Sequence, residues 1–217
     1  MNLFTTREKR LCAILCNAII IALELVGGII ITINSVTAGN GWKQFQYYTQ
    51  DSNYFAMIVS ILFLIWALRK KKDEPLPDWL LVLRYIATCL LSVTFLVIVF
   101  ILCPPYGWEG YRYALLSDAQ VFEHLLCPIL SFVSLLLFED TPKQTGAPFF
   151  AMIPTFLYAA VAVSLNFANV WHGPYPFLYV YEQPWWQSVL YAIVIPLGAF
   201  LVAFFLLFAL KKRKAKE

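Results

Sequence analysis

The chain has 217 residues, of which 61% are hydrophobic and only 13% are charged, and its net charge is +3. A soluble domain carries about 25% charged residues, so this composition excludes an ordinary soluble protein and indicates an integral membrane protein. Chains that span a bilayer form helix bundles or closed barrels. The long apolar blocks lack the alternation of barrel strands and predict a bundle. The five cysteines lie in or beside these blocks, as expected for small buried side chains rather than a disulfide framework.

The apolar blocks predict an all-α, polytopic membrane protein with six transmembrane helices in a single domain, residues 1–217. The predicted helices are residues 11–33, 47–68, 80–103, 118–138, 147–167 and 188–210. We expect the first to be retained, because its apolar block of 23 residues exceeds the roughly 7–15 residues of a signal sequence. Pro104 and Pro105 end the third helix, since proline cannot continue a helix.

The lysines and arginines predict which way the helices run. If both termini are cytoplasmic, 14 of the 16 basic residues face the inner side, including Arg84 and the run Arg69–Lys72, and only Lys43 and Arg112 face outward. Such an excess of basic residues marks the cytoplasmic side of membrane proteins. The loop before the last helix carries many aromatic residues and no lysine or arginine, so we expect it to cap the outer interface.

Two of the predicted helices reach spanning length only by including polar residues. The uninterrupted apolar blocks 54–68 and 125–138 hold 15 and 14 residues, whereas a span needs about 20. The first extension adds Thr49, Gln50, Asp51, Ser52 and Asn53, and the second adds Asp118, Gln120, Glu123 and His124. Polar groups at membrane depth are costly and indicate a functional site. The two helices therefore predict a shared polar pocket that opens toward the outer leaflet.

A hydroxyl, an imidazole and an acid in one partly dry pocket are the groups of nucleophilic acyl transfer. We expect Thr49 to attack and His124 to remove its proton, with Glu24 or Asp51 orienting the imidazole. Asn53 or Gln50 would donate to the oxyanion. At about 1.5 Å per residue, Glu24, His124 and Asn53 lie near one level and Thr49 lies about a turn higher. The supporting residues of this predicted site are Glu24, Gln50, Asp51, Ser52, Asn53 and Glu123.

Structural roles for the same residues remain open. Thr49 and Ser52 can cap the second helix, and Asp51 and Asn53 favour its first turn. Glu24 is either the partner of the imidazole or a structural hydrogen-bonding group. Cys127, one turn from His124, is a nucleophile or, more commonly, an inert packing residue.

The sequence predicts no metal, cofactor or nucleic acid. Its two histidines, His124 and His172, are far apart, which does not fit a catalytic zinc site. The phosphate- and dinucleotide-binding motifs are missing from the sequence, and the basic runs follow the membrane edges. The expected partners are membrane lipids and a lipid or fatty-acyl ester substrate.

Three segments resemble a known family. Residues 48–53, Tyr-Thr-Gln-Asp-Ser-Asn, are similar to the "F-T-x-x-S-N" segment of bacterial six-helix proteins related to the animal androgen-induced and androgen-dependent TFPI-regulating membrane proteins. Residues 124–130 resemble their "H-x-x-x-P-x-L" segment, and residues 173–178 resemble the bacterial "Y-P-Y-P-F-L" segment. The chain departs from the last pattern at Gly173 and Pro174, where an aromatic residue is usual.

The resemblance implies an activity. Animal members of that family are threonine hydrolases that cleave fatty acid esters of hydroxy fatty acids with one threonine and one histidine. It therefore implies that Thr49 forms an acyl-threonine intermediate, that His124 is the base and that the protein lies in a bacterial plasma membrane. The alternative is a non-catalytic lipid- or small-molecule-binding protein or a transporter, in which the same groups hold a polar head.

Overall fold

The computed structural model describes residues 5–69 and 74–216, and every regular element in these ranges is helical. Lys70–Lys72, which the sequence analysis places on the inner side, lie outside the described residues. The long helices are α1 (Thr6–Thr37), α2 (Tyr48–Arg69), α3 (Asp78–Val97), α6 (Ala147–Phe167) and α7 (Trp185–Lys214). The shorter α-helices are α4 (Gly107–Leu116) and α5 (Cys127–Leu137). Single turns of 3₁₀ or π helix are η1 (Gly41–Gln46), η2 (Ile98–Leu102), η3 (Pro104–Tyr106), η4 (Phe122–Leu126) and η5 (Pro176–Leu178).

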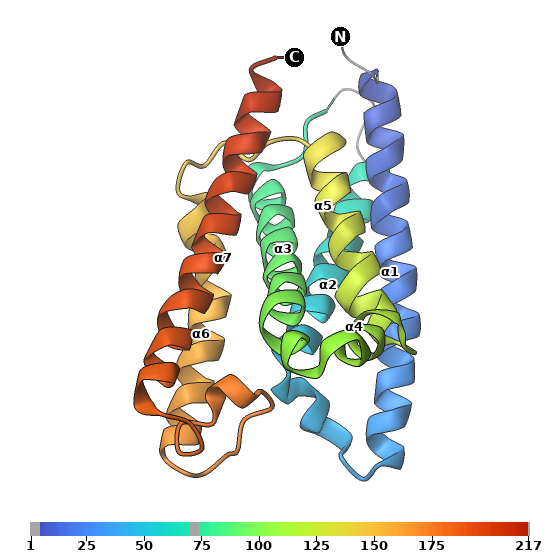
Figure 1. Cartoon of the computed structure of the whole chain (residues 1–217). Coiled ribbons are helices and arrows are strands. Elements are labelled where there is room, and N and C mark those ends of the chain that lie inside the picture. Colours follow the sequence, from blue (N-terminus) through green and yellow to red (C-terminus); the bar gives the residue numbers. More distant parts are fainter. Residues whose placement is uncertain (1–4, 70–73, 217) are drawn as a thin grey trace.

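The helices form an elongated bundle with both ends of the chain at the same end of the molecule (Figure 1). α3 lies at the centre and contacts α2, α5, α6 and α7, and its predominantly apolar sequence makes it the most buried of the long helices. α6 and α7 pack against each other on one side of α3, and α1, α2 and α5 pack on the other.

Five helices are long and apolar enough to cross a membrane, which supports the prediction of an integral membrane protein. Large apolar side chains cover their outward faces, as lipid contact requires; examples are Leu15, Ile29, Phe156, Leu197 and Phe204. The helix expected at 118–138 is shorter than predicted: the chain turns at Asp118, whose φ is +39°, and the continuous apolar helix covers Phe122–Leu137. At 1.5 Å per residue it is about 24 Å long, less than the hydrocarbon core of about 30 Å.

The segment before η4 contains a helix that the sequence did not predict. α4 lies across the bundle axis instead of along it (Figure 1). Tyr111 of α4 donates a hydrogen bond to the Val99 carbonyl at 3.0 Å, which fastens α4 to the end of the central helix. Arg112, expected on an outer loop, forms an exposed ion pair with Glu109 on this helix.

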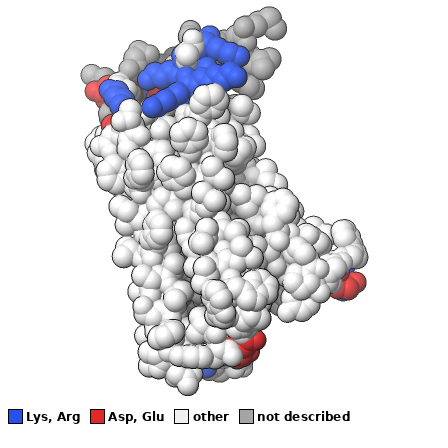
Figure 2. All heavy atoms as spheres, turned by 60° about the vertical axis from the view of Figure 1, so that its left-hand side comes forward, with Lys and Arg blue, Asp and Glu red and all other residues white. Residues whose placement is uncertain are grey.

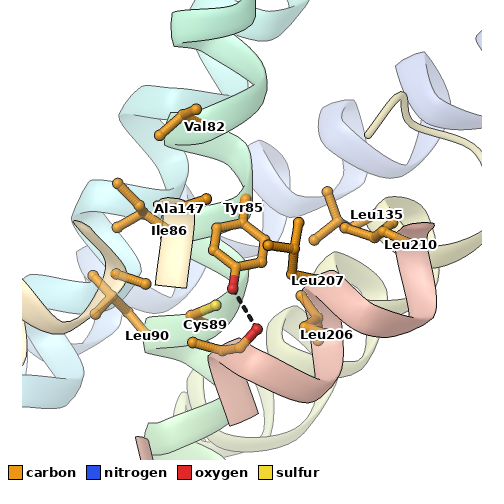
Figure 3. Close-up of a cluster of buried hydrophobic side chains, with 12 residues drawn as sticks. Val82, Tyr85, Ile86, Cys89, Leu90, Leu135, Ala147, Leu206, Leu207 and Leu210 are labelled. Atoms are coloured by element: carbon orange, nitrogen blue, oxygen red, sulfur yellow. Dashed lines mark hydrogen bonds between the residues drawn. The ribbon is translucent and has the colours of Figure 1, made fainter. Parts of the chain in front are cut away.

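A cluster of buried apolar side chains joins α3 to α5, α6 and α7 (Figure 3). Tyr85 lies at its centre and is fully buried. Its hydroxyl donates a hydrogen bond to the Ala203 carbonyl of α7, so the phenol keeps a partner inside the apolar cluster. Leu206 and Leu207 of α7 pack against the same ring region.

A buried ion pair lies near the end of the bundle that carries the termini. Arg84 of α3 and Glu139, just after α5, approach to 2.8 Å, and neither side chain has any exposed surface. Ser134 and Asn17 also donate to the Glu139 carboxylate, at 2.6 and 3.1 Å. Arg84, predicted among the inner basic residues, is therefore a core residue. The lysines and arginines that do reach the surface gather mainly at this end (Figure 2).

Candidate functional site

Thr49 lies in the first turn of α2 and is buried. Its carbonyl accepts hydrogen bonds from Ser52 Oγ at 2.9 Å and from Asn53 Nδ2 at 2.8 Å. Its backbone N–H donates to the Tyr175 hydroxyl at 3.4 Å. Ser52 and Asn53 therefore donate to a carbonyl of the first turn, and it is Tyr175 that accepts from the open Thr49 N–H at the start of the helix. Thr49 also lines the wall of a cleft.

The cleft, which we name the polar cleft for the polar side chains in its wall, has a volume of about 650 Å³ and lies at the end of the bundle away from the termini. α1, η1, the start of α2, η4 and the loop between α6 and α7 surround it. Thr49 and His124 both line it, together with Gln50, Gln120 and Glu123. The fold therefore brings the predicted nucleophile and the predicted base, 75 positions apart in the chain, to one cavity.

A backbone carbonyl orients His124. The imidazole Nδ1 lies 2.7 Å from the carbonyl oxygen of Ala114 in α4. Since a carbonyl oxygen only accepts, Nδ1 carries the proton in the neutral imidazole and Nε2 keeps its lone pair. The orienting group is thus the unpredicted helix α4 and not an acid. Among the described residues, Thr49 and His124 make no direct hydrogen bond to each other.

The two acids predicted to orient His124, Glu24 and Asp51, make no hydrogen bond to it among the described residues. Asp51 is exposed and faces a separate surface groove next to Tyr158 of α6, so it does not orient His124. Ser52 shares a hydrogen bond with Thr94 at 3.1 Å on that same side of α2. Glu24 interacts with the Cys127 thiol, which is itself buried. Glu24 is therefore a neighbour of the cleft wall, and of the two roles that the sequence left open for it, this contact fits the structural one.

Four side chains form what we name the outer oxygen cluster: Glu24, Gln50, Asn53 and Glu123. Gln50 Nε2 donates to the Glu123 carboxylate, and Asn53 Nδ2 donates to the Glu123 carbonyl at 3.4 Å. Asn53 Nδ2 also donates to the Thr49 carbonyl, so both of its N–H groups have protein acceptors, whereas Gln50, which lines the cleft, uses one N–H on Glu123. In the part of the chain that the structure describes, no three His, Cys, Asp or Glu side chains come together as metal ligands; the cluster offers two carboxylates and two amides.

An apolar cavity of about 370 Å³ adjoins the polar cleft. It lies between α3, α6 and α7, and both volumes fall in the range of small-molecule sites, about 300–1,000 Å³. Four residues line both the cavity and the cleft: Thr49, Ile98, Leu102 and Tyr175. Thr49 therefore stands at the boundary between a polar and an apolar space.

Tyr175 is the residue of the site that sequence reasoning missed. It was expected among the aromatics at the membrane interface, but the loop between α6 and α7 folds inward and buries it. Its ring stacks on Phe177, with centroids 5.0 Å apart, and meets the edge of Tyr47. Burial raises the pKa of the Tyr175 phenol to about 12, against the lowering effect of its hydrogen bonds with Thr49. His172 of the same loop forms an exposed ion pair with Glu182 at 2.6 Å, in line with an ordinary loop role.

Comparison of the chain with protein family models, curated proteins and solved structures finds no match. The resemblance to the bacterial six-helix proteins therefore stays a prediction carried by three short segments.

Proposed function

We propose that the protein is an intramembrane threonine hydrolase that cleaves a lipid ester, such as a fatty acid ester of a hydroxy fatty acid. The observation that supports this function best is the position of Thr49. Its side chain borders both an apolar cavity, suited to an acyl chain, and the polar cleft that contains His124. When the carbonyl of a lipid ester lies at that boundary, the acyl chain of the ester can occupy the apolar cavity and its reacting atoms can lie among the polar groups of the cleft.

In the proposed reaction the acyl chain occupies the apolar cavity and the ester carbonyl lies against Thr49. His124 Nε2, directly or through one water, takes the proton from Thr49 Oγ1 as the oxygen attacks the carbonyl carbon. The bond to the alkoxy group breaks, and His124 returns the proton to the leaving oxygen. Water, deprotonated by His124, then attacks the acyl-threonine, releases the carboxylic acid and restores Thr49.

Tyr175 supplies a further donor beside Thr49. Its hydroxyl accepts the Thr49 N–H and also interacts with the Thr49 side chain, so in the proposed reaction its O–H turns toward the substrate oxygen when Thr49 Oγ1 attacks. With a pKa of about 12 the phenol stays protonated at neutral pH. Preorganised donors aimed at a developing oxyanion commonly contribute 10²–10³-fold to the rate.

The proposed orientation places both termini in the cytoplasm of a bacterial cell and the cleft toward the outer leaflet of the plasma membrane. The gathering of lysines and arginines near the termini supports it (Figure 2). The lipid ester would enter laterally from the outer leaflet, because its chains partition there.

The test is covalent labelling with a lipid-like fluorophosphonate, together with hydrolysis of a long-chain ester. We expect wild type to be labelled and Thr49→Ala and His124→Ala to lose both labelling and at least about 10³-fold of the hydrolysis rate. Thr94→Ala is the matched control, since it removes another hydroxyl from the same apolar cavity. Equal labelling of wild type and Thr49→Ala would remove Thr49 from the role.

The competing function is non-catalytic binding or transport of a lipid or small molecule. It is favoured by the fact that Thr49 and His124 are not hydrogen-bonded to each other in the described structure. It predicts that a lipid ester remains intact in the purified protein and that the fluorophosphonate forms no adduct.

A further inference from the structure

The outer oxygen cluster contains two buried carboxyl groups that no described basic side chain pairs with. Glu24 and Glu123 are both about 1% exposed, and their carboxyl groups interact with each other. Neither forms an ion pair with any described lysine, arginine or histidine. Two like charges inside a protein are unfavourable unless a proton or a cation lies with them. The cluster thus calls for a positive partner.

The cluster also contains oxygens that lack hydrogen-bond donors. Glu24 Oε1, Gln50 Oε1 and Asn53 Oδ1 are buried and have no hydrogen-bond partner among the described residues. The orientation of the two amides is fixed, because Gln50 Nε2 donates to the Glu123 carboxylate and Asn53 Nδ2 donates to the Thr49 and Glu123 carbonyls. A buried acceptor without a partner is unfavourable, because it has lost its hydrogen bonds to water and gained none. Each of the three belongs to a side chain that interacts with Glu123, and with the Glu123 carboxylate they form a set of oxygen ligands.

From these two observations we propose that the outer oxygen cluster binds a divalent hard cation of the calcium type. A divalent charge neutralises the two carboxylates, and the amide oxygens complete an all-oxygen set. Calcium accepts carboxylate, amide and water oxygens in irregular geometry, whereas magnesium demands a near-ideal octahedron. The ligands come from three separate helical elements, α1, α2 and η4, which suits the more tolerant ion.

The local fold around Glu123 fits a binding site. Glu123 lies in the π turn η4, in which the Cys127 N–H bonds the Phe122 carbonyl five residues back. Such π turns inside helices frequently occur at functional sites. Gly27 of α1 faces this turn, and a Cβ there would lie 3.5–3.8 Å from Phe122 and Glu123. Gln50 and Glu123 also line the polar cleft, which gives a cation its route of entry.

Calcium titration of the full-length protein in detergent tests the proposal. Because no ester substrate is present, the result does not depend on whether the protein is a hydrolase. With CaCl₂ as the titrant, we expect isothermal titration calorimetry to show saturable binding of one Ca²⁺ per chain. The unfolding temperature should rise with the calcium concentration. Glu24→Gln and Glu123→Gln should each weaken calcium affinity by at least about tenfold. Glu109→Gln, a change at an exposed acid outside the cluster, should bind like wild type. Magnesium at equal concentration should bind more weakly.

A second measurement uses wild type alone, in case a variant fails to fold. A hydrophobic carbodiimide modifies carboxyl groups in apolar surroundings, and peptide mass spectrometry locates the product. Calcium should protect Glu24 and Glu123 at least about tenfold at saturation, with little effect on Glu109. Lack of saturable calcium binding in wild type, unchanged affinity in both glutamine variants, or equal modification with and without calcium would overturn the proposal.

Discussion

Two buried polar clusters lie in opposite halves of the bundle, and they differ in whether their acidic side chains have a basic partner. At the end near the termini, the Glu139 carboxylate is paired with Arg84 and also receives donors from Ser134 and Asn17, so its charge is balanced. At the other end, Glu24 and Glu123 are two buried acids next to each other, none of the described basic side chains pairs with them, and three oxygens of the cluster lack donors. The first arrangement contains its own counter-charge. The second does not, and it lies beside the open cleft, which is why we propose that it holds a ligand.

The largest effect should follow from breaking the balanced cluster. Glu139→Gln leaves the Arg84 guanidinium buried without a counter-charge, so we expect the free energy of unfolding to fall by about 3–5 kcal/mol. Unfolding in detergent, followed by loss of helical circular dichroism, measures it. A loss of less than about 1 kcal/mol would show that the pair does not stabilise the bundle.

A smaller effect is expected at Tyr175. Tyr175→Phe removes the proposed oxyanion donor and keeps the ring that packs on Phe177, so the ester hydrolysis rate should fall about 10–100-fold with the protein still folded. Steady-state kinetics measures it, and Tyr179→Phe on the same loop is the control. An unchanged rate would exclude the donor role.

The pH dependence of stability checks the environment of Tyr175. Its pKa in the folded protein is raised above the ordinary value of about 10 to about 12, so the folded state holds the proton more tightly. The stability gained in this way is fully present below pH 10 and is lost between about pH 10 and 12. The difference in unfolding temperature between wild type and Tyr175→Phe should therefore be flat from pH 7 to 9 and change only at higher pH. A change near neutral pH would contradict the burial of the phenol.

The smallest change in stability is expected in the outer oxygen cluster. Its sign should be opposite to that of Glu139→Gln. Glu123→Gln removes one of two like charges, so in calcium-free buffer the stability should equal that of wild type or exceed it by up to about 1 kcal/mol. The same unfolding assay measures it. If this variant were destabilised as strongly as Glu139→Gln, the contrast between the clusters would fail.

Hydrophobic patterning was enough to predict an all-helical membrane protein, because helix length and apolar content are local properties. It also led to Thr49 and His124, since both extend helices that are otherwise too short. It could not predict α4, whose carbonyl at Ala114 orients the imidazole, because this helix is polar enough to pass for a loop. The inward fold of Tyr175 and the pairing of Arg84 with Glu139 arise from contacts between segments distant in the chain, which local patterns do not encode.

The central claim is that Thr49, at the boundary between the cleft and the apolar cavity, carries the acyl group during turnover. Acid quenching of the full-length protein during hydrolysis of a long-chain ester, followed by peptide mass spectrometry, tests it most directly. The account predicts the mass of the acyl group on the peptide that contains Thr49, and its absence in Thr49→Ala. An acyl group on Cys127 or another residue, or hydrolysis that persists in Thr49→Ala, would contradict it.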